Sequence, residues 1–189
     1  MTKSALRKTA KRTISDGKTK QETFDELSLV SSIPLADLSL IIRRISSIPA
    51  RNKYRILNYV LVIFLSLTVA VKMLESIPTI VEKGLFWIPI IMIYPAINIL
   101  LLVGVASYNY LAYLWVAILS ILGLLGVFLK FAQYPSLTLF IVDVAFMIIF
   151  IFLAFFLKAK LFPYYVTKKE MYQNELGENR MRYVFRFVD

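Results

Sequence analysis

Four long apolar segments limit what this chain can fold into. A helix rises about 1.5 Å per residue and the hydrocarbon core of a bilayer is about 30 Å thick, so about 20 apolar residues suffice to cross it. Four segments meet this requirement, at residues 56–74, 85–105, 111–129 and 137–157. Hydrophobic residues make up 59% of the 189 positions, above the roughly 45–50% of soluble domains. The sequence therefore predicts an all-α integral membrane protein with four transmembrane helices.

The positions of the basic residues predict how these segments are oriented. Lys and Arg gather on the cytoplasmic side, close to the ends of transmembrane helices. The basic residues close to the start of the first segment or the end of the last are Arg43, Arg44, Arg51, Lys53, Arg55, Lys158, Lys160, Lys168 and Lys169. The two predicted outer connectors hold only Lys83 and Lys130, and Lys72 lies at the edge of the first segment. Both termini are therefore predicted to be cytoplasmic, with the bacterial inner membrane as the predicted location.

The formal net charge of +10 is explained by these flanking residues. Basic residues beside apolar helices are attracted to anionic lipid headgroups, so no nucleic-acid partner is predicted. The connector at residues 107–110 holds no basic residue. Its Tyr108 and Tyr110, together with Tyr113 and Trp115, predict an aromatic belt at the membrane interface.

The residues before the first segment divide into two parts. Residues 1–18 are basic and polar with few large apolar side chains, which predicts disorder. Residues 19–55 predict short cytoplasmic amphipathic helices. Thr19 and Glu22 have the spacing of a capping box, and the phrase Ser-Ser-Ile-Pro at 31–34 and 46–49 predicts the starts of two further helices, of which the last runs into the first segment.

Two arrangements are open for these short helices. Either they pack on one another, or they lie on the inner leaflet with their basic side chains at lipid headgroups. The predicted headgroup contacts are Arg43, Arg44, Arg51, Lys53 and Arg55. Helices this short bury little surface among themselves, which favours some membrane contact.

Residues 158–189 are predicted to form a cytoplasmic tail with a strand near its end. The apolar residues Met181, Tyr183, Phe185 and Phe187 occupy alternate positions, which is the period of a β-strand. A turn at 176–179 would pair this strand with residues 165–172. The aromatic face of such a hairpin is expected to be buried against the N-terminal helices, a second subunit or lipid. The alternative is a helix at 168–176 followed by a flexible tail.

A few polar residues within the segments are candidates for chemistry. Asp143 is the only acidic residue in them, and an ionised carboxylate costs about 2.5–3.5 kcal/mol there. Lys72 and Lys130, near the same membrane edge, are its ion-pair candidates. Pro95 predicts a kink, and Asn98 presents an amide one turn later. These residues either hold the helices together, which is favoured, or line an ion path.

The residue content argues against catalysis. The chain has no His and no Cys, which removes imidazole, thiolate and Cys/His metal chemistry. No glycine-rich phosphate-binding motif is present, and neither enzyme activity nor a cofactor is predicted. The predicted function is that of a non-catalytic membrane scaffold or accessory protein. Its predicted partners are the lipid bilayer, anionic lipid headgroups and a second copy or a partner membrane protein. The alternative is a small homo-oligomeric channel or transporter that uses Pro95, Asn98 and Asp143.

Overall fold

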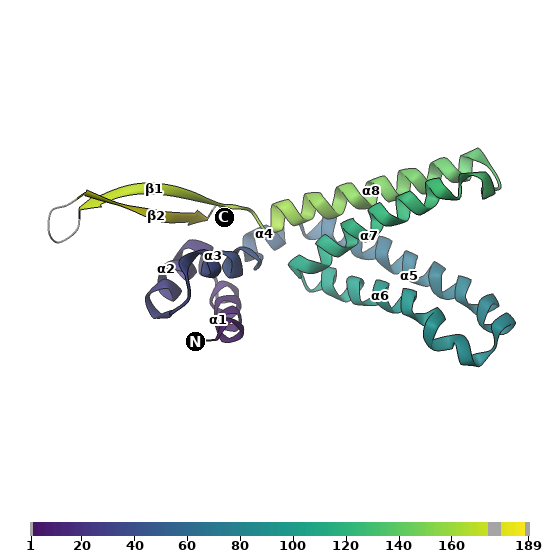
Figure 1. Ribbon diagram of the computed structural model, residues 1–189, viewed down its shortest axis with the longest axis horizontal. Coiled ribbons are helices and arrows are strands. Elements are labelled where there is room, and N and C mark those ends of the chain that lie inside the picture. Colours follow the sequence, from purple (N-terminus) through teal and green to yellow (C-terminus); the bar gives the residue numbers. More distant parts are fainter. Residues whose placement is uncertain (1, 174–178, 188–189) are drawn as a thin grey trace. The chain divides into compact units, whose positions relative to one another are not determined.

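The chain folds into two compact units in the computed structural model, which describes residues 2–173 and 179–187 (Figure 1). The end unit combines both ends of the chain, Met1–Lys53 and Ala159–Asp189. The bundle comprises Tyr54–Lys158. Each unit has its own interior, so each is described by itself.

The bundle contains four helices that are long and apolar enough to cross a membrane. They are α5 (Arg55–Lys83), α6 (Ile88–Ala106), α7 (Tyr110–Leu129) and α8 (Leu137–Leu161). Short 3₁₀ helices, η1 (Leu85–Trp87) and η2 (Phe131–Gln133), lie in the connectors before α6 and α8. The prediction of four helices of spanning length is confirmed.

Large apolar side chains cover the outside of the bundle. Leu100, Leu129 and Phe152 are 72%, 86% and 69% exposed. Burying such a side chain away from water is worth about 1.5–3 kcal/mol, so a soluble protein would not leave many of them uncovered. Such a surface is suited to the apolar surroundings of lipid tails.

Helix α5 continues beyond the predicted end of the first span. The apolar segment ends at Leu74, whereas the helix runs to Lys83 and contains Pro78. Proline has no backbone N–H to donate to the carbonyl of Leu74. The Ser76 hydroxyl donates a hydrogen bond of 2.7 Å to the carbonyl of Lys72 in the same stretch. Hydropathy therefore located the apolar part of this helix but not its end.

A close approach holds α6 against α7. Tyr108, in the connector, adopts a left-handed φ of 54°, and Asn109 caps α7 by accepting a hydrogen bond of 3.1 Å from the backbone N–H of Leu111. A Cβ atom added at Gly104 would lie only 2.6 Å from the Cβ of Ala112. The two helices thus pack at a distance that only glycine at position 104 permits.

Aromatic rings join α8 to α5. The ring of Phe64 in α5 lies 5.4 Å from that of Phe146 and 5.8 Å from that of Phe150, measured between centroids. Offset and tilted ring pairs at such distances add about 0.5–1.5 kcal/mol to the burial of their surface. This cluster forms one wall of the interior described below.

The end unit begins with four helices. They are α1 (Lys3–Ser15), α2 (Lys20–Val30), α3 (Leu35–Arg43) and α4 (Ile48–Lys53). The predicted capping box at Thr19 and Glu22 is present at the start of α2. Only Tyr54 separates α4 from α5, so the last short helix and the first span are two helices where one continuous helix was predicted.

The predicted disorder of residues 1–18 is wrong, because α1 occupies most of them. Leu6, Ala10 and Ile14 recur every four residues and are at most 1% exposed. They form a narrow apolar stripe that is buried with residues of α2 and α3. The core of the unit consists of Leu6, Ala10, Ile14, Phe24, Leu27, Leu38, Ile42 and Ile45. The polar composition of the segment concealed this stripe, which is only three residues long.

The C-terminal part of the end unit is an antiparallel hairpin. Strand β1 (Tyr165–Gln173) pairs with β2 (Asn179–Phe187), with Tyr165 opposite Phe187. The hairpin prediction is confirmed and the alternative helix at 168–176 is wrong, while most of the predicted turn at 176–179 falls outside the described residues. The Phe24 ring of α2 lies 5.7 Å from that of Phe185 and 5.6 Å from that of Phe187. Phe185 and Phe187 are therefore partly buried against the N-terminal helices, which is one of the three coverings expected. Met181, on the same face, is 68% exposed.

Candidate functional site

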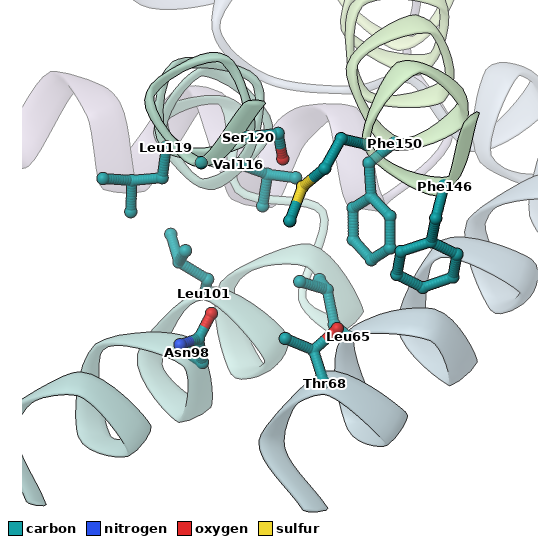
Figure 2. Close-up of a pocket in the computed structure, with 11 residues that line it drawn as sticks. Leu65, Thr68, Asn98, Leu101, Val116, Leu119, Ser120, Phe146 and Phe150 are labelled. Carbon is teal, nitrogen blue, oxygen red and sulfur yellow. The ribbon is translucent and has the colours of Figure 1, made fainter. Parts of the chain in front are cut away.

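All four helices of the bundle line a cavity that is partly open at the bundle surface (Figure 2). The volume open to the centres of water-sized molecules is about 60 Å³. Its polar lining consists of Thr68 from α5, Asn98 from α6 and Ser120 from α7, and the remaining lining side chains are apolar. Phe146 and Phe150 line the α8 side. Three polar side chains from three helices thus line a cavity whose other lining side chains are apolar.

Of the three residues predicted to form an ion path, the structure places one at this cavity. Asn98 lines it, whereas Pro95 and Asp143 are not among its described lining residues. Pro95 is buried inside α6, and Asp143 is exposed on α8. An ion path through Pro95, Asn98 and Asp143 of a homo-oligomer stays a prediction.

Asp143 has a different partner from the ones predicted. The Tyr134 hydroxyl, in the connector before α8, donates a hydrogen bond of 2.8 Å to the Asp143 carboxylate. This hydrogen bond is the main cause that raises the pKa of Tyr134 above its usual value of 10.0. Lys72 instead forms an ion pair of 2.6 Å with Glu75, one turn along α5. The sequence argument favoured lysine because it considered charge and overlooked the phenol nine residues away.

A buried polar network joins the other end of the bundle. The Tyr113 hydroxyl, on α7, donates a hydrogen bond of 2.6 Å to Asn58 Oδ1, on α5. The Asn58 amide donates to the carbonyl of Val105, at the end of α6, over 3.4 Å. Tyr113 is 0% and Asn58 is 1% exposed. Three helices therefore share one hydrogen-bonded group.

This network was not predicted from the sequence. Tyr113 was assigned to an interfacial aromatic belt and is instead fully buried, whereas Trp115 is 51% exposed as such a belt requires. The signal for Asn58 was an amide in the first turn of an apolar helix, where an unpaired polar group is costly. A polar residue at that position implies a partner on a neighbouring helix.

Two of the five residues predicted to contact lipid headgroups make contacts within the end unit. The guanidinium of Arg43 lies 3.7 Å from the centroid of the Tyr164 ring, which is a cation–π contact. The Arg51 Nε donates a hydrogen bond of 2.7 Å to the Ser46 hydroxyl. Arg44, Lys53 and Arg55 are exposed. Arg43 and Arg51 therefore have clear structural roles in the unit.

A further set of cations lies on α1, in a segment that was predicted to be disordered. Lys3 pairs with Asp37 at 2.7 Å, and Arg12 lies 3.9 Å from Asp16. Three further basic residues lie between Lys3 and Arg12 in the sequence and are exposed, namely Arg7, Lys8 and Lys11. They make no ion pair within residues 2–173 and 179–187. Folding of α1 turns them from scattered charges into a fixed surface, which we name the α1 basic face.

A capping box begins α2, the helix that follows α1 in the chain. The backbone N–H of Thr19 donates a hydrogen bond of 2.8 Å to the Glu22 carboxylate, and the Thr19 hydroxyl accepts one of 3.1 Å from the backbone N–H of Glu22. The hydrogen bond from the Thr19 backbone is the main cause that lowers the pKa of Glu22. This contribution to stability is present above the usual pKa of a glutamate and is lost as the pH falls through the lowered value.

Comparisons of this chain with protein-family models, with curated proteins and with solved structures found no match. Across the described part of the chain, no three acidic side chains come close enough together to hold a metal ion. The interpretation of function rests on the cavity, the buried network and the α1 basic face.

Proposed function

We propose that the protein is a non-catalytic membrane scaffold or accessory protein. Helices α5, α6, α7 and α8 anchor it in the bilayer, with both termini on the cytoplasmic side. The end unit is the functional part, and it binds anionic surfaces, with the lipid headgroups of the inner leaflet as the first partner. An acidic patch on a partner membrane protein would present the same chemistry.

The observation that supports this proposal is the α1 basic face. Arg7, Lys8 and Lys11 are exposed cations on one folded helix, and the neighbouring Asp16 and Asp37 already have cationic partners. Each Lys or Arg close to an anionic membrane surface contributes about 1 kcal/mol. Three such residues together contribute about 3 kcal/mol, or about a hundredfold in affinity. Short chain connections to α5 and α8 keep the end unit within reach of the membrane.

The test uses the full chain in vesicles. Because the chain has no cysteine, Ser4→Cys in α1 gives a single site for a dye whose emission reports proximity to lipid. In vesicles with phosphatidylglycerol the dye should report contact with the membrane, and the contact should weaken as salt rises. In vesicles of phosphatidylcholine alone it should report water.

Two variants decide whether the α1 basic face is responsible. Replacing Arg7, Lys8 and Lys11 by Gln should abolish the response to phosphatidylglycerol. The matched control, Lys168→Gln with Lys169→Gln in β1, removes exposed charge from the same unit and should leave most of the response. A dye response that is equal in both lipids, or that survives the triple change, would refute the proposal.

The alternative function is a small homo-oligomeric channel or transporter, and one observation favours it. The cavity is lined by side chains from all four helices of the bundle, and the amide of Asn98 is part of its polar lining. The test is ion or proton flux in vesicles together with the oligomeric state in mild detergent. Flux that Asn98→Leu removes, in an oligomer that still assembles, would place this function first.

A further inference from the structure

The cavity in the bundle carries an inference that does not depend on the end unit. All four helices line it, and it lies in the middle of segments apolar enough to span a membrane. The cavity is partly open at the outer surface of the bundle, and Leu119, one of its lining residues, is 36% exposed. A molecule dissolved in the bilayer can therefore meet its opening.

The size of the cavity shows that water alone fits it poorly. A site needs at least about 10–15 Å³ of this kind of volume to hold a water molecule, and a buried water makes about three hydrogen bonds. The observed volume of about 60 Å³ is several times this minimum. The three polar side chains offer too few partners, since the Thr68 hydroxyl already donates to the carbonyl of Phe64 over 3.0 Å. The polar lining can hydrogen-bond with one or two polar atoms of a bound molecule, and the rest of the cavity is lined by apolar side chains.

The lining also excludes a charged occupant. None of the residues around the cavity is ionisable, and an unpaired charge in such surroundings is strongly disfavoured. Phe146 and Phe150 provide aromatic surface on one side, while Asn98 and Ser120 come from two other helices (Figure 2). The complementary molecule has a small apolar body and one hydroxyl or carbonyl group.

We propose that the bundle cavity is a binding site for a small neutral amphiphile taken from the bilayer. Its apolar body packs against Phe146, Phe150 and Met147, and its single polar group hydrogen-bonds with Asn98 or Ser120. Gly123 keeps the site open, because a Cβ atom added there would lie 3.4 Å from the Met147 Cε and further side-chain atoms would fill the space.

Benzyl alcohol and toluene are the probes, because they share a ring and differ by one hydroxyl group. Fluorinated forms of both are titrated into the purified full-length protein in detergent and followed by fluorine NMR. Benzyl alcohol should bind saturably and more tightly than toluene. Asn98→Leu keeps the number and branching of the side-chain heavy atoms and removes the amide, so it should weaken the binding of benzyl alcohol about tenfold, the loss of about one hydrogen bond, and leave toluene within about twofold.

A pair of substitutions on α7 tests the location. Gly123→Leu fills the cavity and should abolish binding of both probes. Gly126→Leu introduces the same side chain one turn away, where no atom lies within 4 Å of an added Cβ, and should change neither. If Gly123→Leu does not fold, as judged by circular dichroism, Ser120→Leu serves the same purpose. Probe uptake that never saturates and is equal in all variants would overturn the site, and equal affinity for both probes would overturn its polar part.

Discussion

Removal of the Tyr113 hydroxyl should destabilise the bundle although it leaves every apolar contact in place. In Tyr113→Phe the Asn58 Oδ1 loses the donor that lies 2.6 Å away, and both side chains are buried. An unsatisfied buried polar group costs about 1–3 kcal/mol in proteins generally, and measured couplings in membranes reach about 1.7 kcal/mol. We therefore expect a loss of about 1–2 kcal/mol in the free energy of unfolding.

The geometry also predicts an asymmetry between the two partners. In Asn58→Leu the Tyr113 hydroxyl can turn to the carbonyl of Val105, which lies 3.3 Å away, so this change should cost less in hydrogen bonding than Tyr113→Phe. The double variant replaces both polar groups by apolar ones, so neither is left buried without a hydrogen-bond partner. Its loss should therefore be smaller than the sum of the two single losses by about 1 kcal/mol.

The assay is reversible unfolding of the full chain in mixed micelles by a denaturing detergent, followed by circular dichroism. Tyr59→Phe is the matched control, because Tyr59 lies on the same helix as Asn58 and is 56% exposed. This control should change the free energy of unfolding by less than about 0.5 kcal/mol. The reasoning would be refuted if Tyr113→Phe were as mild as the control, or if the two single losses simply added.

Three further predictions concern other parts of the bundle. Gly104→Ala should cost about 1–3 kcal/mol of bundle stability because the new Cβ meets Ala112 at 2.6 Å. Ala112→Gly in the same chain should recover most of this loss in the micelle assay. Failure of the rescue would show that the close approach of the two helices is not the cause of the loss. Tyr134 should titrate above its usual pKa of 10.0 by ultraviolet absorbance, since its hydroxyl donates to Asp143, and Asp143→Leu should return the pKa of Tyr134 toward that value. The stabilisation from this hydrogen bond is present below the usual pKa and is lost as the pH rises through the raised one. If Asp143→Leu left the titration of Tyr134 unchanged, the contact would be refuted. Reporter fusions at Gly84 and Ser136 should lie outside the cytoplasm if both termini are cytoplasmic, and a cytoplasmic signal from either one would break the four-span topology.

The sequence predicted the long helices well because hydropathy acts over many residues. Runs of about 20 apolar residues leave few alternatives to a spanning helix, and the alternation at Met181 and Phe185 predicted a strand for a similar reason. The capping box at Thr19 was found because its two residues interact locally. In each case the pattern lies within one short stretch of the chain.

Features that depend on contacts between distant segments were missed or misassigned. Helix α1 is stabilised by burial of a three-residue stripe against α2 and α3, and a stripe this short cannot be distinguished from chance in one sequence. Asn58 and Tyr113 are 55 residues apart, so nothing local joins them. The cavity depends on how four helices pack, which hydropathy does not encode. The predicted partners of Asp143 were lysines because they would neutralise its charge, whereas its partner in the structure is the neutral phenol of Tyr134.

The end unit has a consequence for how the protein is made. Helices α1, α2 and α3 leave the ribosome before the four long helices, whereas the hairpin that packs on Phe24 is synthesised after them. The hydrogen bond from the Phe187 N–H to the Gln21 side chain joins residues 166 positions apart, with all four apolar helices between them. The side of Phe24 that contacts the hairpin therefore stays uncovered until all four long helices have been translated. A chain that stops early would carry this uncovered aromatic ring on its surface, where chaperones and proteases recognise incomplete proteins.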